Sequence, residues 1–150
     1  MKSAQEPDNE WQRIWFSIRQ QGWTSLALVP SHSGIDAVKV AEAFAATGRI
    51  QGERPVKVIN ATGVHLEGVQ HLIESVAAAV GRGEWVIVPV DAIAENPSAI
   101  AIVQAASAAL LLVRLGESLL ASAQNAIEAV GRERFLGSVV LDESSNAVLR

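Results

Sequence analysis

The sequence contains no cysteine and no tyrosine, and each absence excludes a class of function. Without cysteine the chain has no disulfide framework, no thiolate metal site and no cysteine nucleophile, which is typical of proteins from reducing compartments. Without tyrosine it cannot be phosphorylated on tyrosine. We therefore expect a cytoplasmic protein whose fold depends on its hydrophobic core.

Basic residues are few and scattered. The 150 residues include 12 Lys and Arg against 16 Asp and Glu, for a formal net charge of −4. Proteins that follow a phosphate backbone carry a basic stripe, so we expect no nucleic acid as a partner. The longest apolar run, residues 99–113, is shorter than a membrane span and is interrupted by Gln104 and Ser107, so we expect no direct membrane span.

The two ends of the chain are more polar than its middle. The N-terminal residues lack the apolar core of a signal peptide and the arginine-rich amphipathicity of a transit peptide. We expect residues 1–9 to be a flexible tail, residues 10–141 a single α/β domain, and residues 142–150 a frayed C-terminal tail. A chain of this length can bury roughly two thirds of the surface that it exposes when unfolded.

Short apolar runs alternate with amphipathic segments along the domain. Strands are expected at residues 25–29, 55–59, 84–90, 109–113 and 136–141, and helices at 10–21, 35–47, 65–80, 97–107 and 117–130. This alternation predicts a doubly wound α/β fold with a mainly parallel sheet of about five strands and helices on both faces. Gly48 is expected to end the second helix as a C-cap.

Residues 29–40 have the frame of a phosphate-binding loop but lack the residues that bind phosphate. A strand enters a turn at Pro30, and an alanine-rich helix follows Gly34. In such a loop the backbone N–H groups hold the phosphates, a Lys reaches the β- and γ-phosphates, and a Ser or Thr holds Mg²⁺. Here the lysine position is Ala37 and the hydroxyl position is Val38.

Three later segments, residues 85–90, 109–116 and 135–141, extend this pattern in order and spacing. Together with the loop they make residues 10–141 resemble the cytoplasmic kinase domain of bacterial tyrosine kinases of capsule and exopolysaccharide synthesis. Those kinases are related to the partitioning and division-site ATPases that have a deviant phosphate loop. The resemblance implies a P-loop NTPase-like fold.

The resemblance also places the family's loop residues on this chain. Gly34 matches the first glycine of the loop. Asp36 stands where the family has the glycine before the catalytic lysine, Ala37 stands in place of that lysine, and Val38 in place of the Mg²⁺-binding hydroxyl. Asp36 brings a negative charge towards the position of a polyphosphate, which disfavours binding.

The family's acidic positions are also replaced. Its two-aspartate motif falls on Asn60 and Thr62, and its metal-linked aspartate falls on Pro89. Phosphoryl transfer depends on cations and on Mg²⁺ held by oxygen ligands, and these residues supply neither. The segment between Asn60 and Pro89 also has room for only one helix, where the family has a further strand and an active-site helix. We expect a pseudo-ATPase with no catalytic residue, no metal and no cofactor.

The N-terminal helix of these kinases carries Glu-x-x-Arg-x-x-Arg and packs into a neighbouring subunit. Glu10 and Arg13 match the first half of that motif, while Phe16 stands at the second arginine. Trp15 is expected to pack on its own sheet. Glu10, Trp11, Arg13 and Phe16 are therefore the candidate interface of a homo-oligomer, with Phe16 the most exposed aromatic residue.

Other polar residues near the loop suggest weaker candidate sites. Ser31, His32, Ser33 and Gly34 could present N–H groups to a lone anion without any ATP function. Asp91 could replace the metal ligand lost at Pro89, although it has no partner acid in the sequence.

The histidines and serines do not form a recognisable catalytic group. His65 and His71 lie six residues apart on one predicted helix, which is not metal-ligand spacing, and both are expected at the surface. Ser31, His32 and Asp36 are close in sequence, but the nucleophile-elbow pattern of a Ser/His/Asp hydrolase is absent.

Two hypotheses of different classes follow. The preferred one is a catalytically inactive scaffold or regulator of bacterial exopolysaccharide synthesis or export. Its partner would be a chain-length-determining membrane protein or an active kinase, which would recruit it to the inner membrane face. The alternative is a divergent nucleotide-dependent switch or ATPase completed by a partner subunit. An unrelated flavodoxin-like binding module is a third reading, which strand order distinguishes.

Overall fold

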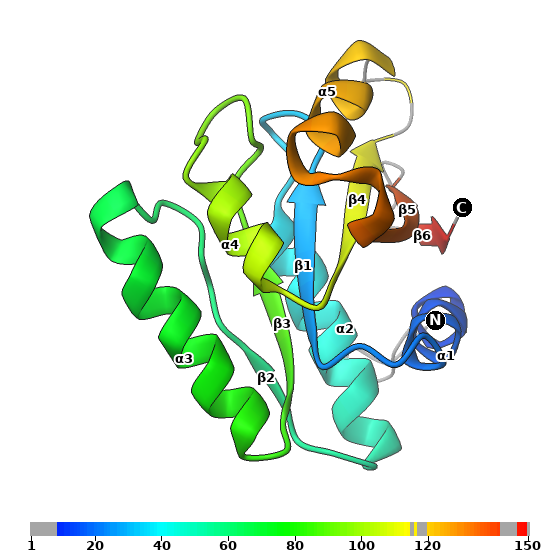
Figure 1. Cartoon of the computed structure of the whole chain (residues 1–150). Coiled ribbons are helices and arrows are strands. Elements are labelled where there is room, and N and C mark those ends of the chain that lie inside the picture. The colour runs from blue at the N-terminus through cyan, green and yellow to red at the C-terminus, as the bar shows by residue number, and fades with distance from the viewer. Residues whose placement is uncertain (1–8, 115, 117–119, 142–146, 150) are drawn as a thin grey trace.

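A six-stranded β-sheet forms the centre of the protein (Figure 1). The computed structural model describes residues 9–114, 116, 120–141 and 147–149. The strands are β1 (Ser25–Pro30), β2 (Val56–Val58), β3 (Trp85–Pro89), β4 (Ala108–Arg114), β5 (Phe135–Leu141) and β6 (Ala147–Leu149). They lie in the order β2-β3-β1-β4-β5-β6; the first five are parallel, and β6 runs antiparallel to β5.

Helices cover both faces of this sheet. They are α1 (Asn9–Arg19), α2 (Ala37–Gln51), α3 (Val69–Gly81), α4 (Ala99–Ala105) and α5 (Leu120–Val130), with short 3₁₀ turns at η1 (Leu66–Gly68) and η2 (Arg132–Arg134). Helices α1 and α2 contribute to the core on one face, and α3, α4 and α5 contribute to the core on the other. The predicted doubly wound α/β fold is confirmed.

Strand β1 shows why the apolar runs are continuous. Leu26 and Leu28 point into the core beneath α1 and α2, whereas Ala27 and Val29 point into the core beneath α3 and α4. All of β1 is buried, because a strand covered on both faces needs apolar residues at every position.

The strand order separates the structural alternatives. Strand β1 lies between β3 and β4. In the flavodoxin-like order 2-1-3-4-5 the first strand lies between the second and third. The observed order is therefore not flavodoxin-like, and it is consistent with a P-loop or Rossmann-like doubly wound fold.

The predicted end of α2 at Gly48 is wrong. The helix continues to Gln51 and ends at Gly52, which has φ 77° and whose N–H bonds to the Gly48 carbonyl oxygen at 3.1 Å. Gly48 instead allows a close tertiary approach, because a Cβ atom there would lie 2.7 Å from two ring carbons of Trp15. This glycine lets α1 pack directly on α2.

Some other element boundaries also differ from expectation. Helix α4 begins at Ala99 and not at Pro97. The prediction of a frayed C-terminal tail is wrong for residues 147–149, which pair with β5 through registers such as Val140 with Val148. Residue 9 already belongs to α1, while the flexibility predicted for residues 1–8, the tail at 142–146 and 150, and the helix start at 117–119 fall outside the described residues.

We find no helix in the described parts of the chain with both the length and the apolar character needed to span a bilayer.

Candidate functional site

A crevice lies at the carboxyl ends of β1 and β3, the edge at which open α/β sheets bind ligands. It encloses about 180 Å³ and is lined by the loop after β1 and by residues that follow β2 and β3. A neighbouring hollow of about 530 Å³ shares His32, Ser33, Ala92 and Glu95 with it. The fold thus brings the degenerate loop residues Asp36, Ala37 and Val38 together with Thr62 and Asp91.

Asp36 caps the helix that leaves the loop. Its backbone is extended, and its Oδ1 accepts a hydrogen bond from the Lys39 backbone N–H at 3.1 Å. A side-chain oxygen at this position satisfies one of the free N–H groups of the first helical turn. In a phosphate-binding loop those N–H groups face the phosphate, so Asp36 supplies the helix with an internal anion.

The loop before the helix is also engaged with the protein itself. The Ser31 N–H donates to the Leu112 carbonyl oxygen of β4 at 2.9 Å, so this amide faces the sheet. His32 Nδ1 lies 2.6 Å from the Ser33 carbonyl oxygen and must carry a proton to donate to it. The first bond removes one amide from the predicted anion site at residues 31–34, and the second orients the His32 ring.

The charge of the crevice is opposite to that of a phosphate site. The acidic residues Asp36, Asp91 and Glu95 line it, and His32 is the one basic residue among the described lining residues. Lys39 is exposed and does not line the crevice. A triphosphate placed here would face carboxylates without a compensating lysine or arginine.

The three replaced acidic positions have structural roles, two in the loop after β2 and one at the end of β3. Asn60 Oδ1 accepts hydrogen bonds from the Thr62 N–H at 2.9 Å and from the Thr62 hydroxyl at 2.6 Å, which makes a local Asx turn. Pro89 is buried at the end of β3 and cannot donate to a neighbouring strand. Its carbonyl oxygen still accepts from the Ala61 N–H at 2.9 Å.

Asp91 joins the loops that follow β2 and β3. Its Oδ2 accepts from the Gly63 N–H at 2.7 Å and from the Asn96 side-chain amide at 3.0 Å. The same amide nitrogen of Asn96 donates to the Val64 carbonyl oxygen at 3.0 Å. We call Asp91 and Asn96 the loop clamp. The described residues contain no group of three or more His, Cys, Asp or Glu placed to hold a metal, so nothing supports the metal-ligand hypothesis for Asp91.

Sequence reasoning did not find the loop clamp, because its bonds join residues up to 32 positions apart. In the sequence, Asn96 stands directly before the helix expected at 97–107, a position that does not indicate a tertiary contact. A usable signal is that Asp91 and Asn96 are polar residues in the loop that follows a fully buried strand. The other two histidines, His65 and His71, are exposed, as predicted.

The candidate interface residues lie on α1, away from the crevice. Trp15 is fully buried, with edge-on ring contacts to Trp23 and Trp85, which confirms that it packs within its own subunit. Trp11 is half-buried and meets the ring of Phe44 edge-on, with centroids 5.1 Å apart. Phe16 is 46% exposed, and the Arg19 guanidinium lies 5.8 Å from its ring centroid.

Arg13 is exposed on the same helix, and Glu10 is half-buried and engaged in an interaction. The face that α1 presents to solvent therefore contains one aromatic side chain, Phe16, beside Arg13 and Arg19, and Arg19 also forms an ion pair with Glu53 at 2.7 Å.

No protein-family description matches the chain, and no curated protein is significantly similar to it.

Proposed function

We propose that the protein is a catalytically inactive, P-loop-like domain that acts through protein contacts as a scaffold or regulator in bacterial exopolysaccharide synthesis or export. One observation carries the inactive part of this proposal. The carboxylate of Asp36 bonds to the Lys39 N–H at the start of α2, where a working loop would leave the helix N-terminus open to a phosphate.

The surroundings of Asp36 support the same conclusion. Ala37 and Val38 line the crevice in place of a lysine and a hydroxyl, so neither position supplies a cation for a γ-phosphate or a hydroxyl for Mg²⁺. Asp91, the nearest acid to the lost metal position, is already bonded to Gly63 and Asn96. Restoring phosphoryl transfer would therefore require several simultaneous changes.

The partner side of the proposal depends on the sequence resemblance and on helix α1. Phe16 is a large aromatic side chain left exposed on a helix whose other aromatic residues pack inwards. Exposed aromatic residues next to arginine are typical of interface hot spots. We propose that this face docks on a second copy of the chain, or on the cytoplasmic end of a chain-length-determining membrane protein or an active kinase.

Calorimetric titration of the purified chain with Mg²⁺-ATP and Mg²⁺-ADP tests the inactive assignment. We expect no saturable heat with either nucleotide. The variant Asp36→Asn is the matched control, because asparagine caps a helix as well as aspartate does but carries no charge. It should also fail to bind, since the lysine and hydroxyl are still absent. Micromolar binding to the unmodified chain would overturn the proposal and favour a nucleotide-dependent switch.

A further inference from the structure

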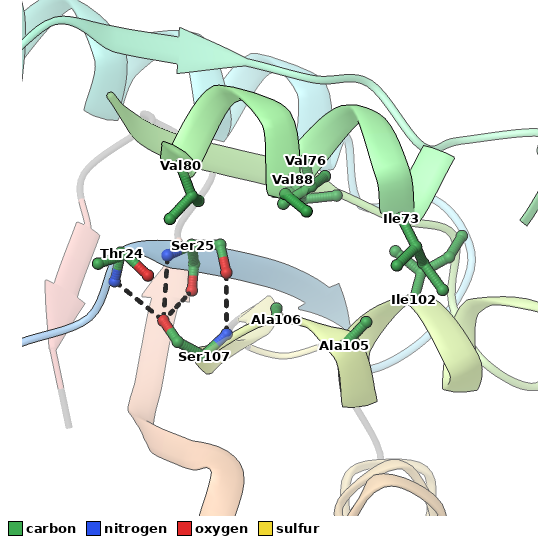
Figure 2. A pocket seen from close by; sticks show the side chains of 11 residues that line it. Thr24, Ser25, Ile73, Val76, Val80, Val88, Ile102, Ala105, Ala106 and Ser107 are labelled. Atoms are coloured by element: carbon green, nitrogen blue, oxygen red, sulfur yellow. Dashed lines mark hydrogen bonds between the residues drawn. The ribbon is translucent and has the colours of Figure 1, made fainter. Parts of the chain in front are cut away.

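A second cavity lies at the opposite end of the sheet from the crevice. It encloses about 290 Å³ between α3 and α4, over the first residues of β1 and the middle of β3. Figure 2 shows Ile73, Val76 and Val80 of α3 facing Ile102, Ala105 and Ala106 at α4 across this space. Among the described residues, no Lys, Arg, His, Asp or Glu lines this cavity.

Ser25 and Ser107, with Thr24 beside them, form the polar end of the cavity (Figure 2). Ser107 Oγ is saturated, because it accepts from the Thr24 and Ser25 N–H groups at 2.9 and 3.0 Å and donates to the Ser25 carbonyl oxygen at 2.8 Å. Ser25 Oγ accepts from the Ser107 N–H at 2.9 Å. The Ser25 hydroxyl hydrogen has no acceptor among the bonds found in the described residues, although Ser25 is only 4% exposed.

A buried hydroxyl hydrogen without an acceptor carries a desolvation cost that a ligand oxygen could offset. Apolar walls with a buried, unused hydroxyl donor are typical of pockets that fix a small apolar molecule by a polar group. The absence of lining cations and anions disfavours a charged ligand, because its desolvation would not be compensated.

We propose that this cavity binds a small, uncharged and largely aliphatic or aromatic molecule with one acceptor oxygen, which bonds to the Ser25 hydroxyl. The volume limits its size. A cavity of roughly 150 Å³ holds benzene, so a cavity of about 290 Å³ accommodates a molecule of about ten non-hydrogen atoms. This site involves no residue of the crevice and no residue of the α1 face, so its test is independent of the test of the proposed function.

Two probes with the same carbon count, 2-octanone and octanoate, test the ligand class on the purified chain. Binding is followed by methyl NMR, with the shifts of Ile73, Val76, Val80 and Ile102 reporting occupancy. We expect the ketone to bind at least about tenfold more tightly than the carboxylate, because only the carboxylate must bury a charge. Ser25→Ala should weaken ketone binding about fivefold, corresponding to one net hydrogen bond.

A pair of alanines on α3 provides a matched control for location. Ala77 and Ala78 are both exposed, but only Ala77 lines the cavity. Ala77→Leu should therefore reduce ketone affinity at least about tenfold by filling the space, while Ala78→Leu, with the same change in helix propensity, should leave it unchanged. Absence of ketone binding, equal binding of octanoate, or equal affinities of the two leucine variants would each overturn the proposal. The probe comparison on the unmodified chain stays decisive even if Ser25→Ala fails to fold.

Discussion

The Asp36 carboxylate accepts a hydrogen bond from the Lys39 backbone N–H at 3.1 Å, so the last residue of the loop caps the N-terminus of α2. This bond relates the altered loop to the stability of the fold. A residue that would obstruct a phosphate contributes instead to holding α2 in place, and α2 supplies Val40, Ala41 and Phe44 to the core.

The cap predicts a specific order of stabilities. Asp36→Ala should lower the free energy of unfolding by about 1 kcal/mol, while Asp36→Asn should retain most of it, because both Asp and Asn accept the bond from the helix N–H. Urea unfolding followed by tryptophan fluorescence measures the difference. If alanine and asparagine were equally destabilising, the negative charge and not the cap would be the stabilising element.

Much of the loop's chemistry could be predicted from the sequence, but its geometry only in part. The replacement of lysine by Ala37 is visible in the residues themselves. An Asp before a helix is a capping signal, but the predicted start at residue 35 places Asp36 inside the helix, whereas α2 begins at Ala37. Local sequence signals identify the helices and strands. An error of one or two residues in a helix boundary, however, changes which residue is assigned as the cap.

Contacts between distant residues could not be predicted in the same way. Gly48 was interpreted as a C-cap because glycine commonly ends helices, whereas its role depends on a ring from another helix. Strand β6 is three residues long, too short for a hydrophobic period to mark it. The loop clamp likewise joins Asp91 to Gly63 over a separation that no local pattern records.

The close approach of Trp15 to α2 predicts opposite outcomes for two glycine substitutions. Gly48→Ala should destabilise the protein by about 1–3 kcal/mol, because the added methyl group would meet the Trp15 ring at 2.7 Å and Val56 at 2.9 Å. Gly81→Ala, also in a helix but with open space around it, should leave stability unchanged or raise it by less than ~1 kcal/mol. Thermal unfolding of the two variants makes the comparison, and equal stabilities would contradict the packing described for α1.

Because the ring of Phe16 is exposed, its removal is predicted to change the mass of the assembly without changing the fold of the chain. At concentrations where the chain self-associates, Phe16→Ala should lower the mass measured by light scattering while altering the free energy of unfolding by no more than about 0.5 kcal/mol. Leu66→Ala is the control, because Leu66 is a 77% exposed apolar residue on η1 and not on α1. It should leave the mass unchanged.

Trp11 is a less clean probe of the same surface. Its ring packs on Phe44, so Trp11→Ala should lower stability by about 1–3 kcal/mol whether or not the helix contacts a partner. The proposal of self-association through this face would be contradicted by a monomeric mass for the unmodified chain at every concentration, or by a mass that Phe16→Ala does not change.

The loop clamp predicts a local effect on hydrogen exchange. The Gly63 N–H donates to Asp91 Oδ2 at 2.7 Å, and Asn96 holds the same carboxylate oxygen at 3.0 Å. Asp91→Ala should therefore speed exchange at Gly63 about tenfold or more, since the loss of a hydrogen bond to a charged group is worth roughly 1.5–3 kcal/mol. Asn96→Ala should have a smaller effect at Gly63, because the direct bond from Gly63 to Asp91 remains.

If Asp91 and Asn96 act as one unit, Gly63 in the double variant should exchange no faster than in Asp91→Ala alone. Exchange measured by NMR at Val86 of the buried strand β3 is the internal control and should not change. An unchanged rate at Gly63 in Asp91→Ala would show that the loop is held by its other contacts, such as the turn between Asn60 and Thr62.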